Sequence, residues 1–231
     1  MKAAIWKGIS TIEIKRLPIP KPVLPTDVTV RVLGCGVCVA DTYILRGAVP
    51  LAKPPVVLGH EIFGEVYQVG PGVDHLKVGD KVCIDPMITC GRCVYCLQGR
   101  PNLCRSMTSV GFRIDGGFQQ FVLAPSSHVH PIAPVSTKAG VLAQPLACVL
   151  HGHNKLTIPP DGTVMILGAG STGLMWTQVV KHGVSTTTLI QSEVFEPRRQ
   201  LAQQLGADYT VNPLRENLRE RVLQIASEGV D

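Results

Sequence analysis

The sequence predicts a mixed α/β protein in two parts, a β domain over residues 1–153 and an α/β region over residues 154–231. Before about residue 155, short Val-rich segments separated by Gly and Pro are typical of strands. After it, strand-like and helix-like segments alternate, which is typical of a parallel sheet covered by helices. The 231 residues are 45% hydrophobic and 17% charged, which suits one large or two modest globular domains.

Four segments of the first part predict strands. They are DVTVRVLG (27–34), FGEVYQVG (63–70), GDKVCID (79–85) and GGFQQFVLAP (116–125). In the first of them Val28, Val30 and Val32 alternate with Thr29 and Arg31, as in a strand with one buried face. We therefore expect a compact β domain with long functional loops.

The second part predicts a series of strands and helices. In order, these are a strand at 163–168, a helix at 171–183, a strand at 185–193, a helix between Pro197 and Gly206, a strand at 207–212, and a last helix with Leu214, Leu218, Val222 and Ile225 on one face. The chain stops where a fourth strand is expected. A dinucleotide-binding sheet has two βαβαβ halves, so we expect a truncated chain that holds only the first half.

Composition and charge limit the location and the partners. The N-terminal stretch MKAAIWKGISTIEIKRLPIP interrupts its apolar residues with charges, so it predicts neither a signal segment nor a membrane span. We expect a cytoplasmic protein without a membrane partner. The formal net charge of +5 is spread among acidic residues, and aromatic residues make up only 5% of the chain, so nucleic acid is not an expected partner.

The stretch CGRCVYCLQGRPNLC predicts a structural zinc site. Its four cysteines, spaced C-x2-C-x2-C-x7-C, are Cys90, Cys93, Cys96 and Cys104. Cytosolic thiols stay reduced, so such a cluster favours a metal over disulfides, and four protein ligands leave no open position for chemistry. Reduced surface cysteines and an iron–sulfur cluster remain the alternatives.

Cys38 and His60 are candidates for a second, open metal site. A zinc ion that does chemistry usually has three protein ligands and one free position, and Cys with His is a suitable start. Taken alone, each residue is more often a buried small residue or a core histidine. The other motifs of the chain favour the metal site.

A glycine-rich turn predicts a nucleotide site. It has the G-x-G-x-x-G pattern, formed by Gly168, Ala169, Gly170, Ser171, Thr172 and Gly173. Glycines in a turn are often only a turn, but here they follow an apolar strand and open a helix, the context of a Rossmann fingerprint whose helix N-terminus faces pyrophosphate.

Glu193 is the expected partner of the adenosine ribose. It ends the second strand about 20 residues beyond the last glycine, where an acidic side chain binds the ribose hydroxyls of NAD and repels the extra phosphate of NADP. Arg198 and Arg199 lie close enough to accept that phosphate, or they form a solvated helix face. We expect NAD rather than NADP.

These motifs together resemble the zinc-containing medium-chain alcohol dehydrogenases, and most of all their polyol and sorbitol dehydrogenase branch. The likeness covers the whole chain. Gly59-His60-Glu61 with Gly64, Gly70 and Val73 fits the zinc signature of that family, residues 38–41 fall at its Cys-Gly-Ser/Thr-Asp motif, and residues 90–104 match its structural zinc lobe. The resemblance implies a chaperonin-10-like (GroES-like) β domain followed by the first half of a Rossmann domain.

The resemblance also implies the ligands of the catalytic zinc. Cys38 and His60 would bind it, with Glu61 as a ligand or as a partner of the ligands. The third ligand of this branch is a Glu before Pro-Leu, but here Gln144 stands at that position. A neutral amide binds zinc more weakly than a carboxylate. Cys148, one helical turn further on, is a further candidate, although the resemblance places no ligand there.

Two further departures concern proton transfer. Ala40 stands where the family carries the Ser or Thr hydroxyl that begins the proton relay, and Tyr43 where a relay His is usual. Alanine can neither donate nor accept a proton, so the relay must differ. A water-mediated route through Glu61 or Tyr43 is the expected substitute.

The resulting functional hypothesis is a zinc-dependent oxidoreductase. It would transfer hydride between NAD(P) and a secondary alcohol, polyol or sugar derivative, with a catalytic and a structural Zn²⁺. A full-length form is expected to be a homodimer or homotetramer. The alternatives are a relative that keeps zinc and nucleotide binding without turnover, and a zinc-ribbon module that binds nucleic acid or protein.

Overall fold

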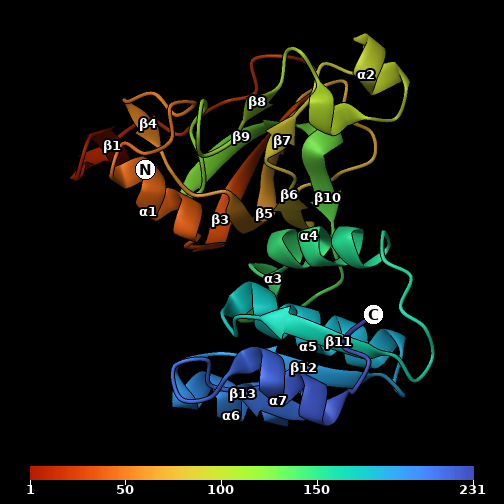
Figure 1. Ribbon diagram of the computed structural model, residues 1–231. Coiled ribbons are helices and arrows are strands. Elements are labelled where there is room, and N and C mark those ends of the chain that lie inside the picture. The colour runs from red at the N-terminus through yellow and green to blue at the C-terminus, as the bar shows by residue number, and fades with distance from the viewer. The chain divides into compact units, whose positions relative to one another are not determined.

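The computed structural model describes all residues, 1–231, and its chain divides into two compact units, Met1–Gln144 and Pro145–Asp231 (Figure 1). The first unit is rich in strands, whereas the second alternates between strands and helices. The predicted mixed α/β class is therefore confirmed. The division falls at the start of helix α4 (Ala143–His153), and the boundary predicted after residue 153 falls at the end of the same helix.

The first unit is built on antiparallel strands. They are β1 (Lys2–Gly8), β2 (Thr11–Arg16), β3 (Asp27–Gly36), β4 (Val56–Val57), β5 (Glu61–Val69), β6 (Lys81–Ile84), β7 (Met87–Ile88), β8 (Thr108–Ser109), β9 (Phe121–Pro125) and β10 (Val129–Pro131). The main sheet has the order β10-β6-β5-β3-β9, and two smaller sheets have the orders β2-β1-β4 and β7-β8. The four segments predicted as strands correspond to β3, β5, β6 and β9.

Short helices connect these strands. They are α1 (Val39–Leu45), α2 (Val94–Leu97) and α3 (Thr137–Gly140), with single 3-10 turns η1 (Pro101–Leu103) and η2 (Ser126–His128). Helix α1 follows β3 directly, and α2 lies in the long loop between β7 and β8. The first of these segments carries Cys38, and the second carries the four cysteines of the predicted structural zinc site.

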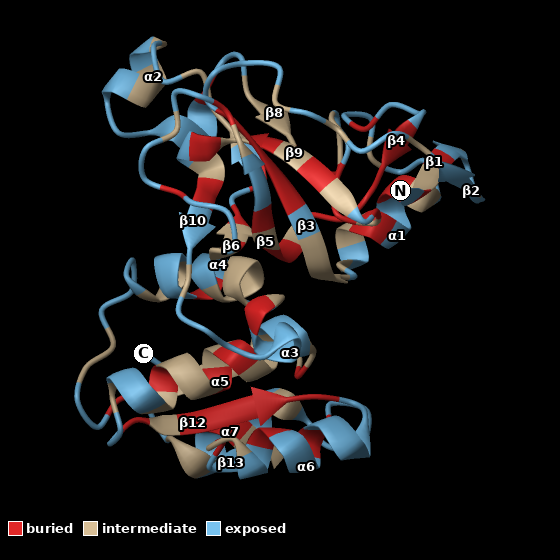
Figure 2. Ribbon diagram, turned by 180° about the vertical axis from the view of Figure 1, so that it is seen from behind, coloured by how far each residue is buried: buried red, intermediate tan, exposed pale blue.

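Strand β3 runs through the core of the first unit. Val28 and Val30 are fully buried, and Figure 2 shows buried residues along this strand and its neighbours. Thr29 is also fully buried, and its hydroxyl is satisfied by donating to the carbonyl of Pro20 at 3.0 Å. The predicted alternation therefore holds at the exposed Arg31 but not at Thr29, where both faces of the strand are covered.

The second unit is a parallel sheet with helical connections. Its strands are β11 (Thr163–Leu167), β12 (Thr188–Ser192) and β13 (Tyr209–Val211), in the order β11-β12-β13, and its helices besides α4 are α5 (Ser171–Gly183), α6 (Glu196–Gln204) and α7 (Leu218–Ile225). Both strand pairs are parallel. The predicted βαβαβα series is confirmed, and the helix predicted at residues 171–183 has those bounds.

One residue of the last predicted helix lies outside it. Leu214 is 80% exposed and precedes α7, which begins at Leu218. The side chain of Asn212 accepts the N–H of Leu214 at 3.0 Å and forms a local turn, and Asn217 caps the helix by accepting the N–H of Glu220 at 3.3 Å. Asn side chains therefore start the helix later than the apolar spacing indicated.

Membrane-spanning helices are not a feature of this fold, since none of its helices has the length and apolar character that crossing a bilayer requires.

A fully buried and an exposed aliphatic residue of the second unit together test the described core. Ile190 in β12 is fully buried, so we expect Ile190→Ala to lower the free energy of unfolding by roughly 2 to 5 kcal/mol. Leu214→Ala removes a similar volume from an exposed position, so we expect a change within about 0.5 kcal/mol. Urea unfolding of both variants measures this difference, and equal losses would contradict the described start of α7.

Candidate metal centres and nucleotide site

Pairing between β3 and β5 brings three candidate metal ligands together. Gly36 at the end of β3 pairs with Glu61 at the start of β5, and His60 directly precedes Glu61. Two residues beyond the end of β3, Cys38 forms the N-cap of α1. One ligand atom from each of Cys38, His60 and Glu61 lies within 4.8 Å of the others. Residues far apart in the sequence therefore share one site.

The Glu61 carboxylate occupies space that is free only because residue 36 is a glycine. A Cβ atom added to Gly36 would lie 2.0 Å from Oε2 of Glu61, which is far inside van der Waals contact. Any other residue at position 36 would push the carboxylate out of the cluster. The glycine is therefore part of the site.

Asp41 holds two of the ligands. Its Oδ2 accepts the backbone N–H of Cys38 at 2.9 Å, and its Oδ1 lies 3.6 Å from Nδ1 of His60. Both Oδ1 and this Nδ1 are buried without a hydrogen-bond partner. A histidine that binds metal through Nε2 carries its proton on Nδ1 and usually turns it toward a carboxylate, so this pair fits a metal-binding His60.

The electrostatics of this cluster also fit a cation. Burial raises the pKa of the Cys38 thiol, and the negative charges of Glu61 and Asp41 raise it further. Burial likewise raises the pKa of Glu61, with a smaller contribution from Asp41 that is opposed by His60. A divalent ion reverses this repulsion and deprotonates a coordinating thiol. One thiol, one imidazole and one carboxylate form a donor set that suits zinc.

Four other predicted residues lie on helices α1 and α4. Ala40 is in the first turn of α1, and Tyr43 on the same helix is 49% exposed. Gln144 is half-buried in the first turn of α4 and is the last residue of the first unit, whereas Cys148 belongs to the second unit and is exposed. The roles of Gln144 and Cys148 toward a metal stay predictions.

The four-cysteine loop forms a separate cluster. One sulfur from each of Cys90, Cys93, Cys96 and Cys104 lies within 4.8 Å of the others, and none is in a disulfide. The sulfurs of Cys93 and Cys96 are 3.6 Å apart, and those of Cys90 and Cys96 are 4.0 Å apart. Four sulfurs at about 2.3 Å around one zinc lie roughly 3.8 Å apart, so the spacing fits a tetrahedral ion.

The thiols of this cluster have unequal pKa values. The backbone N–H groups of Cys96 and Arg105 point at the Cys93 thiol and lower its pKa to about 6. Burial and the neighbouring Cys93 thiol raise the pKa of Cys96 to about 11. Without a metal, the Cys93 thiol of this cluster is therefore ionised at neutral pH, whereas Cys96 needs a bound cation to ionise. Tyr95 lies beneath the guanidinium groups of Arg100 and Arg105, at 5.9 and 5.6 Å from the ring centre.

The predicted nucleotide fingerprint lies between β11 and α5. Gly168 has φ +95, a conformation that favours glycine, and Gly170 is the N-cap of α5 without a side-chain cap. A Cβ on Gly173 would lie 2.1 Å from the carbonyl oxygen of Gly168, so the helix starts in close contact with the loop. The exposed residues Ser171 and Thr172 form the first turn, whose N–H groups lack intrahelical partners.

Glu193 lies beside this loop and is buried. Its Oε2 accepts the N–H of Ala169 at 2.8 Å, and its Oε1 accepts the N–H of Phe195 at 3.0 Å. Burial alone would raise the pKa of Glu193, but the N–H groups of Phe195, Ala169 and Val194 together hold it below the ordinary value. The carboxylate is therefore ionised at neutral pH and is a structural part of the loop.

The two arginines after Glu193 differ. Arg198 is half-exposed, with its guanidinium 3.9 Å from the Glu193 carboxylate and 5.2 Å from the centre of the Phe195 ring. Arg199 is buried, and its Nη1 donates to the carbonyls of Glu193 and Val194 at 2.7 and 2.8 Å. Arg199 on α6 therefore binds the backbone just after β12 and is not part of a solvated helix face, so of the two arginines only Arg198 remains available to a phosphate.

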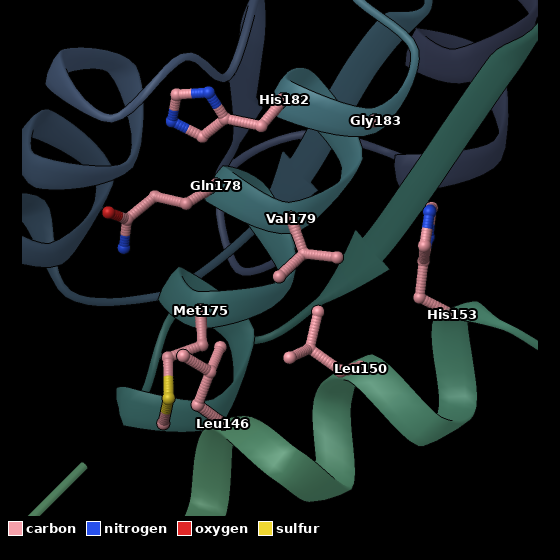
Figure 3. A pocket seen from close by; sticks show the side chains of 8 residues that line it. All are labelled: Leu146, Leu150, His153, Met175, Gln178, Val179, His182 and Gly183. Atoms are coloured by element: carbon pink, nitrogen blue, oxygen red, sulfur yellow. The ribbon is translucent and has the colours of Figure 1, made fainter. Parts of the chain in front are cut away.

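An apolar hollow of about 430 Å³ in the second unit contains none of these residues. Figure 3 shows Leu146 and Leu150 pointing from α4 toward α5, where Met175 and Val179 lie. The polar groups on its border are His153, His182 and Gln178. The candidate chemistry therefore lies outside this hollow.

Sequence reasoning missed the role of Asp41. An acidic residue three positions after the residue that caps a helix is a known signal, because it can accept the N–H of the cap. The pattern Cys-x-x-Asp at residues 38–41 carries that signal, but the contact with His60 depends on the pairing of β3 and β5.

Comparison with known proteins gives one matching family and many relatives. Residues 24–134 match the alcohol dehydrogenase GroES-like domain. Sorbitol dehydrogenase of Bacillus subtilis strain 168 is 32% identical over 237 residues, which cover 100% of this chain and 67% of the relative.

Solved structures agree in fold. A provisionally named zinc-binding dehydrogenase of Sinorhizobium meliloti 1021, bound to NADP, is 37% identical with a TM-score of 0.90, over 95% of this chain and 64% of that one. The short-chain alcohol dehydrogenase RspB of Escherichia coli CFT073, complexed with NADH, is 32% identical with a TM-score of 0.87. The match covers 97% of this chain and 66% of that one. The chain spans 64 to 67% of the length of these three relatives, and 62% of the length of the starvation-sensing protein RspB of Escherichia coli strain K12.

The buried carboxylate of Glu193 predicts a pH dependence of stability. Its pKa is lower in the folded chain, so it stabilises the fold above the ordinary glutamate pKa of about 4.3 and loses this effect as it is protonated. We expect Glu193→Gln to be less stable than the wild type at pH 7, with a difference that shrinks as the pH falls through the folded pKa.

Urea unfolding of the wild type and Glu193→Gln between about pH 7 and about pH 3 measures this. The exposed Glu228→Gln is the matched control and should change stability by less than about 0.5 kcal/mol. A difference for Glu193→Gln that grows toward low pH would contradict the described contacts.

Proposed function

Because the chain belongs to the zinc-containing alcohol dehydrogenase family, we propose that it transfers hydride between a secondary alcohol or polyol and a nicotinamide dinucleotide. The convergence of Cys38, His60 and Glu61 within 4.8 Å in the first unit, together with an intact nucleotide fingerprint in the sequence of the second, carries this proposal. The sorbitol dehydrogenase relative supports a polyol as the substrate class.

The chain's own residues prepare the metal site in this proposal. Zinc, when bound, supplies Lewis-acid polarisation of an alcohol oxygen. Cys38, His60 and Glu61 would hold it and leave one position open for the alcohol oxygen, and Gln144 is proposed to tune the site as a neutral neighbour. Asp41 fixes the backbone at Cys38 and faces Nδ1 of His60, which leaves Nε2 of that ring for the ion.

The alcohol proton needs a route that differs from the family relay. Ala40 has no hydroxyl, so it cannot take part. Glu61 is the carboxylate of the cluster and the proposed acceptor, and Tyr43 on the exposed side of α1 is the alternative that reaches solvent. Either route includes a water molecule.

NAD is the proposed cofactor. The ionised Glu193 carboxylate beside the loop favours ribose hydroxyls and repels an extra phosphate. Arg198 favours the phosphate of NADP, and the relatives bind either NADP or NADH, so the balance rests on the burial and charge of Glu193. The nicotinamide of the bound cofactor supplies the hydride acceptor.

Location and assembly belong to the same proposal. We place the protein in the cytoplasm, where eight cysteines without a disulfide are expected to stay reduced. A homodimer or homotetramer of the full-length form is the proposed assembly. Small alcohols, polyols or sugar derivatives are the proposed partners, and nucleic acid and membranes are not.

A second candidate function is zinc and nucleotide binding without turnover. Gln144 in place of a carboxylate and Ala40 in place of a hydroxyl favour it. Both substitutions leave the fold intact, so a binding protein would keep every other feature described above. Activity measurements distinguish the two.

Polyol oxidation by the zinc-loaded chain tests the proposal. We expect NADH formation with sorbitol and NAD, and a loss of more than about 100-fold for Cys38→Ser, since even the partners of metal ligands contribute 10- to 100-fold. Gln144→Glu restores a charged ligand and should raise the rate at limiting zinc. Cys83→Ser, at a half-buried cysteine outside both clusters, is the control and should retain activity.

Sorbitol, other polyols and simple secondary alcohols should be compared with both NAD and NADP. No turnover with any of them by the wild type and by Gln144→Glu would favour the binding function.

A further inference from the structure

Two side chains at the end of β12 hold a single peptide group of the glycine loop. Nε2 of Gln191 donates to the carbonyl oxygen of Gly168 at 3.0 Å, and Oε2 of Glu193 accepts the N–H of Ala169 at 2.8 Å. Gln191 and Glu193 are two positions apart, so their side chains leave β12 on the same side. Both ends of the peptide between Gly168 and Ala169 are therefore held, one by a residue of β12 and the other by the residue that directly follows this strand.

Gln191 is an unusual residue for its position. It is fully buried in the central strand of the parallel sheet, where apolar residues are the rule. A buried amide is costly unless its donors and acceptor are used. Here the Gly168 carbonyl can only accept, which assigns Nε2 to it. Oε1 then faces Thr177 and accepts its hydroxyl at 2.6 Å.

This arrangement fixes the turn before α5. Gly168 also donates its N–H to the carbonyl of Ser192 at 2.7 Å. Its carbonyl oxygen lies close to the backbone of Gly173, where an added Cβ would be 2.1 Å away, so the loop is packed directly against the first turn of α5. The orientation of this peptide decides where the next N–H groups, at Gly170 and Ser171, are directed.

We propose that Gln191 is a positioning residue for dinucleotide binding, which acts by holding the Gly168 carbonyl so that the loop and the first turn of α5 face the pyrophosphate. The bond to Gly168 comes from Nε2 of Gln191, whereas the hydroxyl of Thr177 pairs only with Oε1 of that amide, and Glu193 holds the other end of the same peptide. This inference rests on the proposed function, because it assumes that the glycine loop binds a nucleotide.

Calorimetric titration with ADP-ribose tests the inference, since this ligand carries the pyrophosphate and the adenosine ribose without the nicotinamide. Gln191→Met keeps the side-chain length but cannot donate to Gly168. We expect its Kd to rise about tenfold, which corresponds to about 1.4 kcal/mol.

Thr177→Val is the matched variant. It removes the other hydrogen bond of the same amide but leaves the bond from Gln191 to Gly168 in place. It leaves Oε1 of Gln191 unsatisfied, so it should lower the melting temperature, yet we expect its Kd for ADP-ribose to stay within about threefold of the wild type. A purely structural role for Gln191 would instead make affinity follow stability in both variants, and that outcome overturns the inference.

Gln191→Leu is the second variant and serves if Gln191→Met does not fold. Its apolar side chain also cannot donate to the Gly168 carbonyl and places no charge in the buried site, so it should likewise bind ADP-ribose about tenfold more weakly. If the Gln191 variants bind ADP-ribose with wild-type affinity, the inference about Gln191 is wrong while the proposed nucleotide site stands. A wild-type chain that does not bind ADP-ribose would contradict the proposed nucleotide site and this inference with it.

Discussion

The antiparallel pairing of β3 with β5 is the constraint on which the candidate metal centre depends. It places Gly36 opposite Glu61, so that a residue just after one strand and two residues at the start of the other meet at one point. The pairing is anchored by a core of fully buried side chains that includes Val30 and Ile62. Because the ligands follow directly from the ends of packed strands, the fold holds them in place without help from mobile loops.

Charge explains why both clusters of the first unit suit a cation. Cys38 and Glu61 each resist ionisation because burial and neighbouring carboxylates act against them. In the four-cysteine lobe, the Cys93 thiol ionises readily while Cys96 does not. In both places several potential anions share a small volume, and a divalent ion converts their repulsion into binding. The two sites differ in coordination. Four thiols fill all the positions around one zinc ion, whereas Cys38, His60 and Glu61 leave one position of the other ion open.

Local patterns predicted much of this protein from the sequence. The spacing of Cys90 to Cys104 and the glycines at 168–173 are signals contained within a few residues, and α5 has the predicted bounds. The contacts that sequence reasoning missed join distant segments: Asp41 with His60, and Gln191 with Gly168. Leu214 and Arg199 show a different limit. The apolar character of Leu214 predicted a buried helix face, but the Asn212 side chain holds it in a turn before the helix. The charge of Arg199 predicted a solvated face, but its guanidinium is buried and donates to the Glu193 carbonyl.

Zinc content per chain tests the central claim most directly. Elemental analysis of the purified wild type should find two zinc ions per chain, with one in Cys38→Ser and one in Cys96→Ser, because each variant removes a ligand from a different cluster. Cys83→Ser should keep both ions. A wild type with a single zinc that is lost in Cys96→Ser but unaffected by Cys38→Ser would contradict a metal centre at Cys38, His60 and Glu61.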